Sequence, residues 1–206
     1  MARFYIDFDS TLYDTDRIRN FDREIALSLT KYVGLSFEDS VKKVQQTHKI
    51  KKKVFDICDA LEEEYQVNKG LLREGVERFL AEGKKFVFND AIDFLKRLVS
   101  KGHEINILTF TDKEFDYQML KLKGSGILQF VDNVIICAKD KGKLGLDYEN
   151  AIFIDDNPSA LKSLYLAGVS EKRLIRMRRA GAGYSSIEID DFPVTEVKSF
   201  DEIDNF

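Results

Sequence analysis

Two short apolar segments of this chain, one near each end, stop abruptly at aspartates. The first, residues 3–9, contains Asp7 and Asp9, and the second ends in Asp155 and Asp156. Apolar runs of this length are typical of strands that are buried on both faces of a parallel sheet. An ionised carboxylate is costly there unless a cation or hydrogen bonds compensate it. If the two strands are neighbours, at least three carboxylates meet at one sheet edge, where a hard divalent cation is their simplest partner.

The composition is that of a globular protein and limits the classes of partner that it could bind. The 206 residues are 44% apolar and 33% charged, enough for one domain or one domain with a sizeable insertion. A net charge of −4 argues against a nucleic-acid partner, which would require a basic face. Cys58 and Cys137 form neither a disulfide framework nor a metal-binding spacing. With no signal-like or membrane-spanning run, we expect a soluble, cytoplasmic protein without a membrane partner.

Residues 14–85 carry a helical pattern. Their apolar residues recur at three- and four-residue steps, which predicts several short helices in succession. Ser36 followed by Asp39 is typical of a helix start. Short helices with brief links indicate a small helical bundle.

From residue 86 onwards, strand-like and helix-like segments alternate. The predicted strands cover residues 104–109, 131–137, 151–154 and 174–177, with 195–197 as an edge strand. This alternation predicts right-handed crossovers and a parallel sheet. Residues 1–13 and 86–206 are therefore expected to form a Rossmann-like α/β core flanked by helices, into which residues 14–85 are inserted. Ligands of such sheets bind beyond the carboxyl ends of the strands.

Asp7 and Asp9 differ in what they can do. Asp9 could simply belong to a turn whose side chains cap backbone groups, a reading about as good as any functional one. That role is not available to Asp7, which is expected inside the apolar run. A carboxylate fixed there beside a metal can act as a nucleophile and form an acyl phosphate. The second carboxylate could protonate a leaving group and later accept a proton from water.

Three further signals are individually weak. The acidic pair 155–156 could cap the helix that follows, although two successive aspartates favour cation ligation. Thr109 could equally bond to backbone at its strand end. Lys139, Lys141 and Lys143 form a turn that would normally be a solvated loop. Together, a nucleophile, a hydroxyl, a cation and a metal site suit phosphoryl transfer, which requires neutralisation of charge on the equatorial oxygens.

These motifs, in this order, resemble those of the haloacid dehalogenase superfamily over essentially the whole chain. Residues 7–11 match the family's Asp-x-Asp-x-Thr, Thr109 its strand-end hydroxyl, and residues 155–156 its acidic pair. Ser10 stands where the family usually has glycine. Lys141 is the favoured motif lysine because Lys-Gly followed two residues later by Leu resembles the family's form. Lys143 is the second candidate for the motif lysine, and Lys139 is the third.

The resemblance implies a role for each of four residues. Asp7 is implied to be the nucleophile that accepts the phosphoryl group, and Asp9 the acid and base. Thr109 is implied to donate to a phosphoryl oxygen, and Lys141 to be a catalytic and substrate-binding residue. Asp9 would then have to be protonated at neutral pH, so its environment should raise its pKa.

The resemblance also implies a cofactor and a cap. Magnesium would be held by Asp7, by the backbone carbonyl of Asp9, and by Asp155 or Asp156. The helical segment 14–85 resembles the cap that many members carry after the first motif, which closes over the substrate and excludes water.

The implied activity is a magnesium-dependent phosphatase acting on a small phosphorylated metabolite through an aspartyl phosphate. An acid two residues after the nucleophile resembles phosphatases and phosphomutases, whereas dehalogenases lack it, so a phosphomutase is the nearest alternative. A receiver-type signalling domain uses similar residues, but its acidic pair lies near the N-terminus and its acceptor follows a later strand. The opposite order in this chain disfavours a receiver.

Two basic clusters are expected to be solvated surface charges. One is residues 48–53, for which a patch that attracts an anionic substrate, or a lysine that forms a Schiff base, is the alternative. The other follows the last predicted central strand and consists of Arg176, Arg178 and Arg179.

Overall fold

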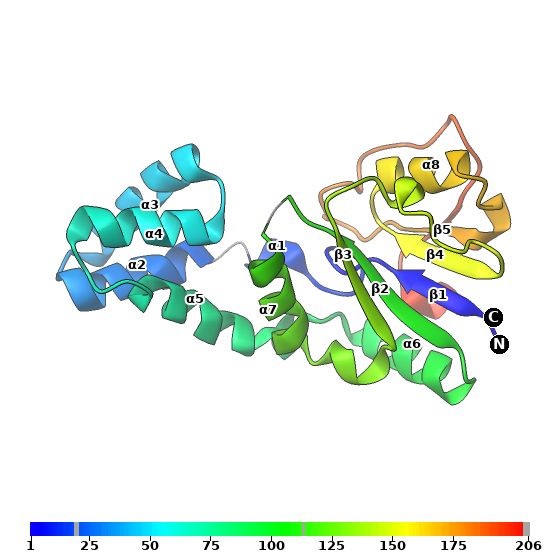
Figure 1. Cartoon of the computed structure of the whole chain (residues 1–206), viewed down its shortest axis with the longest axis horizontal. Coiled ribbons are helices and arrows are strands. Elements are labelled where there is room, and N and C mark those ends of the chain that lie inside the picture. The colour runs from blue at the N-terminus through cyan, green and yellow to red at the C-terminus, as the bar shows by residue number, and fades with distance from the viewer. Residues whose placement is uncertain (19–20, 113, 204–206) are drawn as a thin grey trace. The chain divides into compact units, whose positions relative to one another are not determined.

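The computed structural model describes residues 1–18, 21–112 and 114–203 and divides into two compact units (Figure 1). The sheet unit comprises Met1–Asp16, Phe86–Phe115 and Ile127–Phe206, and the helical unit comprises Arg17–Lys85 and Asp116–Gly126. The predicted α/β fold is confirmed. The helical unit includes residues 116–126, which were predicted to belong to the α/β core.

Within the residues that the structure describes, the sheet has six strands, all parallel, in the order β3-β2-β1-β4-β5-β6. The strands are β1 (Arg3–Ile6), β2 (Glu104–Phe110), β3 (Asn133–Cys137), β4 (Ala151–Asp155), β5 (Leu174–Met177) and β6 (Thr195–Val197). β6 is the predicted edge strand. The two segments that end in aspartates are neighbours, with Ile6 of β1 opposite Ile154 of β4.

β1 is shorter than expected, because it ends at Ile6 rather than Asp9. Asp7 lies one residue past the strand, although its N–H still donates to the carbonyl of Ile154 at 2.8 Å. The chain then turns sharply, with the Leu12 N–H bonded to the Phe8 carbonyl at 3.0 Å and with Ser10 at φ +58°. That φ favours glycine, the residue usual at this position in the family that the motifs resemble.

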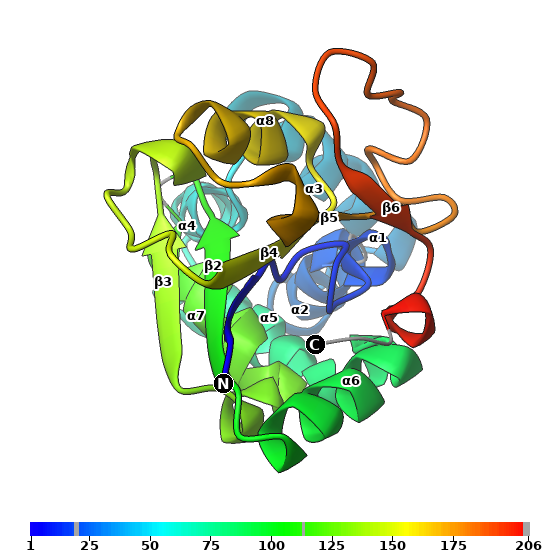
Figure 2. The same ribbon diagram turned by 90° about the vertical axis from the view of Figure 1, so that its right-hand side faces the viewer.

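Successive residues of β1 pack on opposite faces of the sheet, as the period of a strand requires. Phe4 meets Phe94 of α6 (Asn89–Ser100) edge to face at 6.1 Å between ring centroids. Tyr5 stacks on Phe153 and shares a core with Leu161 of α8 (Pro158–Leu166). The two helices therefore cover opposite faces, as Figure 2 shows.

The helical unit contains α2 (Phe21–Val33), α3 (Phe37–Lys51), α4 (Val54–Tyr65), α5 (Leu71–Ala81) and most of α7 (Phe115–Ser125). Of α1 (Thr15–Ile18), the first two residues belong to the sheet unit and the last two to the helical unit. The predicted start at Ser36 is confirmed, because its hydroxyl accepts from the Asp39 N–H at 3.1 Å. α7 joins this unit because Tyr117 meets Phe55 edge to face at 6.0 Å. Short 3₁₀ helices occur in the chain at Gly83–Phe86 (η1), Ile127–Phe130 (η2), Lys141–Lys143 (η3), Glu171–Arg173 (η4) and Phe200–Glu202 (η5).

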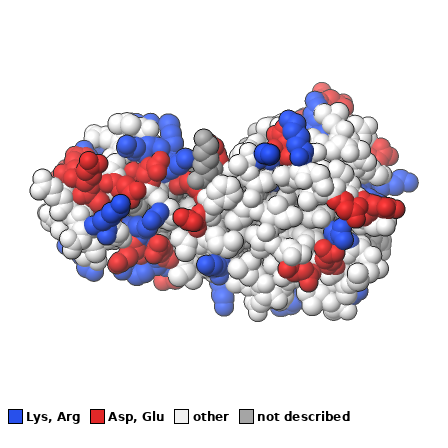
Figure 3. All heavy atoms as spheres, in the orientation of Figure 1, with Lys and Arg blue, Asp and Glu red and all other residues white. Residues whose placement is uncertain are grey.

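Charges of both signs are interspersed on the face shown in Figure 3. In the basic stretch of the helical unit, Lys49, Lys51 and Lys52 are exposed, as expected. Within the described residues, no helix combines the length and apolarity needed to cross a membrane.

The expectation that Arg176 and Arg179 are surface charges is wrong. Arg176 is 0% exposed and donates to the carbonyls of Tyr184 (2.8 Å) and Ile187 (2.6 Å). Arg179 is also buried and donates to the Thr11 carbonyl at 2.9 Å. The segment between β5 and β6 contains no helix or strand, so its carbonyls need side-chain donors, which a guanidinium supplies in a fixed geometry.

Candidate active site

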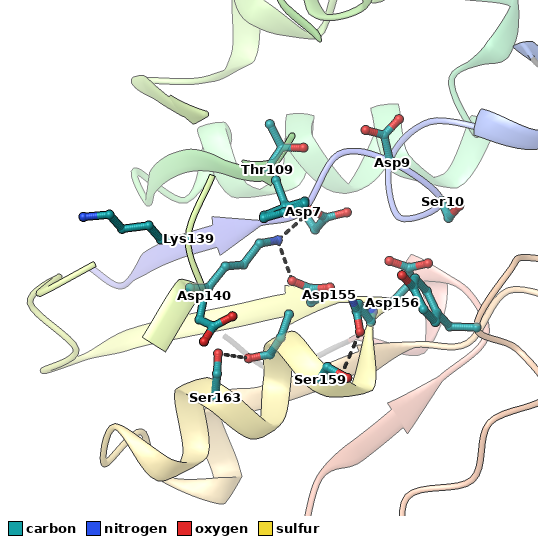
Figure 4. A pocket seen from close by; sticks show the side chains of 15 residues that line it. Asp7, Asp9, Ser10, Thr109, Lys139, Asp140, Asp155, Asp156, Ser159 and Ser163 are labelled. Carbon is teal, nitrogen blue, oxygen red and sulfur yellow. Dashed lines mark hydrogen bonds and ion pairs between the residues drawn. The ribbon is translucent and has the colours of Figure 1, made fainter. Parts of the chain in front are cut away.

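Three carboxylates meet where β1 and β4 end side by side. Each of Asp7, Asp155 and Asp156 offers an oxygen, and these oxygens all lie within 4.8 Å of one another. All three residues are buried. Figure 4 shows them at the carboxyl edge of the sheet, the edge at which open α/β sheets bind their ligands.

Lys141 is the lysine that the structure brings to this cluster. Its Nζ donates to Asp7 Oδ1 and to Asp155 Oδ2, both at 2.6 Å (Figure 4). Burial lowers the pKa of Lys141, but the opposite charges of Asp155 and Asp7 outweigh it and the pKa is raised. Lys143 is exposed instead and pairs with Asp140, and Lys139 is exposed at the rim of the site.

Gly142 fixes the loop that carries Lys141. Its N–H donates to the Ser163 hydroxyl of α8 at 3.1 Å. A Cβ at this position would lie 2.0 Å from the Ser163 carbonyl oxygen, so no larger residue fits without a backbone shift. The approach of this loop to α8 is therefore what places the ammonium between the two carboxylates.

Gly142→Ala is expected to destabilise the protein by about 2 kcal/mol, because the added methyl must push the loop away from α8. Displacement of Lys141 should also lower any activity of the site. Chemical denaturation measures the change in stability. Gly183→Ala is the control, since a Cβ at Gly183 meets nothing within 4 Å. Equal stability of the two variants would show that the close approach is unimportant.

Asp155 and Asp156 have different surroundings. Asp155 accepts from Lys141 through one oxygen and from the Asn157 N–H, at 2.9 Å, through the other. No hydrogen-bond donor among the described residues reaches the Asp156 carboxylate. Neither aspartate caps α8, because the N-cap is Asn157, whose side chain accepts from the Ser159 N–H.

The electrostatics of the cluster fit a divalent cation. Burial, reinforced by the charges of Asp7 and Asp155, raises the pKa of Asp156 to about 9. Burial likewise raises the pKa of Asp7 to about 7, although the charge of Lys141 lowers it. Three ionised carboxylates and one ammonium carry two negative charges in excess, which a divalent cation with oxygen ligands would balance.

Asp156→Asn is expected to raise the melting temperature of the metal-free protein at pH 8 by roughly 5 °C. Folding raises the pKa of Asp156, so the folded state holds its proton more tightly than the unfolded state does. The free energy of unfolding of the wild type is therefore highest at low pH and falls as the pH rises towards 9. Thermal melts in chelator at pH 5 and pH 8 measure this loss. Parallel changes in wild type and variant would contradict it.

Asp9 and Thr109 lie beside the cluster. Asp9 is half-buried on the loop after β1, and its Oδ1 accepts from the Thr15 hydroxyl at 2.7 Å. Within the described part of the chain its side chain is not one of the grouped carboxylates. Thr109, in β2, is 1% exposed and lines the same pocket. Thr15 was not predicted, because a threonine after a turn carries no distinctive signal.

A pocket of about 300 Å³ opens over these residues. All the residues predicted for the site line this pocket: Asp7, Asp9, Thr109, Lys141, Asp155 and Asp156. Phe110 and Tyr184 line it as well and were not predicted. Burial, and then the carboxylates of Asp156, Asp155 and Asp7, raise the pKa of the Tyr184 hydroxyl. No motif marks Tyr184, because its position depends on how the segment after β5 folds back.

The chain matches no protein-family model and no curated protein sequence. It is similar in structure to the HAD phosphatase of Thermococcus onnurineus, with 20% identity, a TM-score of 0.65, and coverage of 98% of this chain and 96% of that chain. It is also similar to the 2-haloacid dehalogenase of Pseudomonas syringae, with 15% identity, a TM-score of 0.66, and coverage of 98% of this chain and 96% of that chain. A third similar structure is a magnesium-bound HAD hydrolase from Bacillus subtilis, with 17% identity, a TM-score of 0.58, and coverage of 98% of this chain and 96% of that chain. The fold is thus shared by phosphatases and dehalogenases alike.

Proposed function

We propose that this chain, which has the fold of the haloacid dehalogenase hydrolases, is a magnesium-dependent phosphatase that acts on a small phosphomonoester. The observation that carries the proposal is the buried Asp7, held by Lys141 at 2.6 Å within a cluster of three carboxylates. The half-buried Asp9 lies two residues further on and lines the same pocket. The fold does not distinguish phosphatase from dehalogenase, so the argument for phosphate rests on Asp9.

In the proposed reaction, Asp7 attacks phosphorus and forms an aspartyl phosphate. Asp9 donates its proton to the departing alkoxide, which leaves as the alcohol. In the second half, Asp9 takes a proton from water, whose oxygen attacks phosphorus and releases inorganic phosphate from Asp7. Thr109 and Lys141 bind phosphoryl oxygens, and Thr15 orients the Asp9 carboxyl through its 2.7 Å hydrogen bond.

Magnesium would neutralise charge on the phosphoryl oxygens when it is bound. Its proposed ligands are Asp7, the backbone carbonyl of Asp9, and Asp156. We assign the direct contact to Asp156 rather than Asp155, because both oxygens of Asp155 already accept hydrogen bonds. Asp155 then acts by fixing Lys141.

The helical unit is proposed to act as a cap over the substrate. Its larger part, residues 17–85, lies between β1 and β2 in the sequence and follows directly after the loop that carries the nucleophile. A cap that excludes water during the first step would favour transfer of the phosphoryl group to Asp7.

A panel of phosphomonoesters, assayed with magnesium and with chelator, tests the proposal. Release of inorganic phosphate that depends on magnesium is the expected result. A phosphomutase would instead need a bisphosphate primer and release little phosphate. Absence of both activities over the whole panel would refute the assignment.

Asp9→Asn is expected to lower kcat by roughly 10²- to 10⁴-fold for alkyl phosphates, whose leaving oxygen needs a proton. The rate of the first step should fall much less for p-nitrophenyl phosphate, because its nitrophenolate leaving group departs without being protonated. Burst kinetics that separate release of nitrophenol from release of phosphate measure this difference. Equal losses for the two substrates would argue against an acid role for Asp9.

A further inference from the structure

Two aromatic side chains at the pocket are exposed. Phe110 is 51% exposed and Tyr184 is 40% exposed, and both line the pocket that contains the carboxylates. Large apolar groups left open to solvent at a concave polar site are a common mark of ligand binding.

The strand order places these side chains on either side of the reacting groups. Phe110 ends β2, next to β1, and the five residues before it in that strand are buried. Tyr184 belongs to the segment that follows β5, next to β4. The aspartates at the ends of β1 and β4 therefore lie between the origins of the two aromatic residues.

The backbone that carries Tyr184 is firmly held, although it is neither helix nor strand. The buried Arg176 donates to the Tyr184 carbonyl at 2.8 Å, and Arg178 donates to the Ser185 carbonyl at 2.8 Å. Because the backbone is fixed from β5, little ordering of this segment is required when a ligand binds.

Two polar side chains at the rim of the pocket, those of Asp140 and Ser163, are engaged with the protein. Asp140 pairs with Lys143, and the Ser163 hydroxyl accepts from the Gly142 N–H and donates to the Ala160 carbonyl. The Lys139 side chain points away from Asp7 and Asp155 (Figure 4). The large apolar surfaces of this lining that remain for a leaving group are therefore the rings of Phe110 and Tyr184.

We propose that Phe110 and Tyr184 bind the leaving group of the substrate, and that this group is a planar aromatic or heteroaromatic ring. The inference rests on the proposed phosphatase activity and narrows it to aryl-type phosphomonoesters. Aromatic rings prefer offset or edge-on partners at centroid distances of roughly 4.5–7 Å, which suits two rings that belong to separate segments of the chain. Phosphoryl binding stays with the groups at the sheet edge, so the two aromatic residues set specificity and take no part in the chemistry.

Calorimetric titration of the full chain with phosphonates, in the presence of magnesium, tests this without turnover. Phenylphosphonate is expected to bind roughly tenfold more tightly than methylphosphonate, and more tightly than cyclohexylphosphonate. Tyr184→Leu and Phe110→Leu should each remove most of this preference and leave methylphosphonate binding unchanged. Tyr184→Phe, which keeps the ring, should retain the preference.

Three results would overturn the inference. The wild type could bind all three phosphonates equally, cyclohexylphosphonate could match phenylphosphonate, or the leucine variants could weaken methylphosphonate as much as phenylphosphonate. Failure of the proposed function is distinguishable, because then neither methylphosphonate nor orthovanadate binds and p-nitrophenyl phosphate is not hydrolysed. That outcome would overturn both proposals. Thermal melts of the variants confirm that they are folded.

Discussion

Asp7→Asn is expected to lower kcat for phosphate release by at least about 10³-fold, because an amide cannot form the acyl phosphate. The substitution preserves the size of the side chain, and its carbonyl oxygen can still accept from Lys141. The variant should therefore fold and bind orthovanadate or methylphosphonate in the presence of magnesium, although more weakly. Steady-state assays, together with the intact mass of acid-quenched enzyme, measure both turnover and the phosphorylated intermediate.

The matched control is Asp140→Asn, a change of the same type at the rim of the same pocket. Asp140 is exposed, pairs only with Lys143 among the described residues, and should keep activity within about twofold. A phosphorylated intermediate that survives in Asp7→Asn would show that another residue accepts the phosphoryl group. Loss of binding together with loss of turnover would instead indicate that the variant had damaged the site.

The part of the fold that could be predicted is the part that local pattern controls. Short apolar strands that end in aspartates predicted a parallel sheet, and the adjacency of β1 and β4 follows from the need to compensate those charges together. The Ser36 cap was predictable for the same reason, since a cap depends on residues three apart.

What could not be predicted depends on contacts between distant segments. Residues 116–126 look like any crossover helix, and only the packing of Tyr117 on Phe55 shows that they belong to the helical unit. Arg176 looked like a surface charge because sequence cannot show that carbonyls of the next segment fold back over it. Lys141 was favoured among the three lysines only through the family resemblance, because its position between the carboxylates depends on the approach of Gly142 to α8.

Lys141→Met is expected to be the most destabilising change at the site in the absence of metal. It leaves Asp7 and Asp155 buried without their shared ammonium, and breaking a buried pair in this way costs about 3 kcal/mol or more. Added magnesium should restore much of the lost stability, since a divalent cation can compensate the same carboxylates. Activity should remain low even with magnesium, because the phosphoryl group also loses a cationic partner. Denaturation curves with chelator and with magnesium measure both effects.

Lys143→Met separates this effect from a general loss of positive charge. Lys143 lies two residues further on, with its side chain 74% exposed, and its loss should change neither stability nor activity appreciably. If Lys141→Met were as stable as Lys143→Met in chelator, the carboxylates would have to be protonated in the metal-free protein. The ammonium would then contribute nothing to folding, and its equal distance of 2.6 Å to both aspartates would have to serve catalysis alone. Raising the pH from 6 to 9 distinguishes the two cases, because only ionised carboxylates require the ammonium.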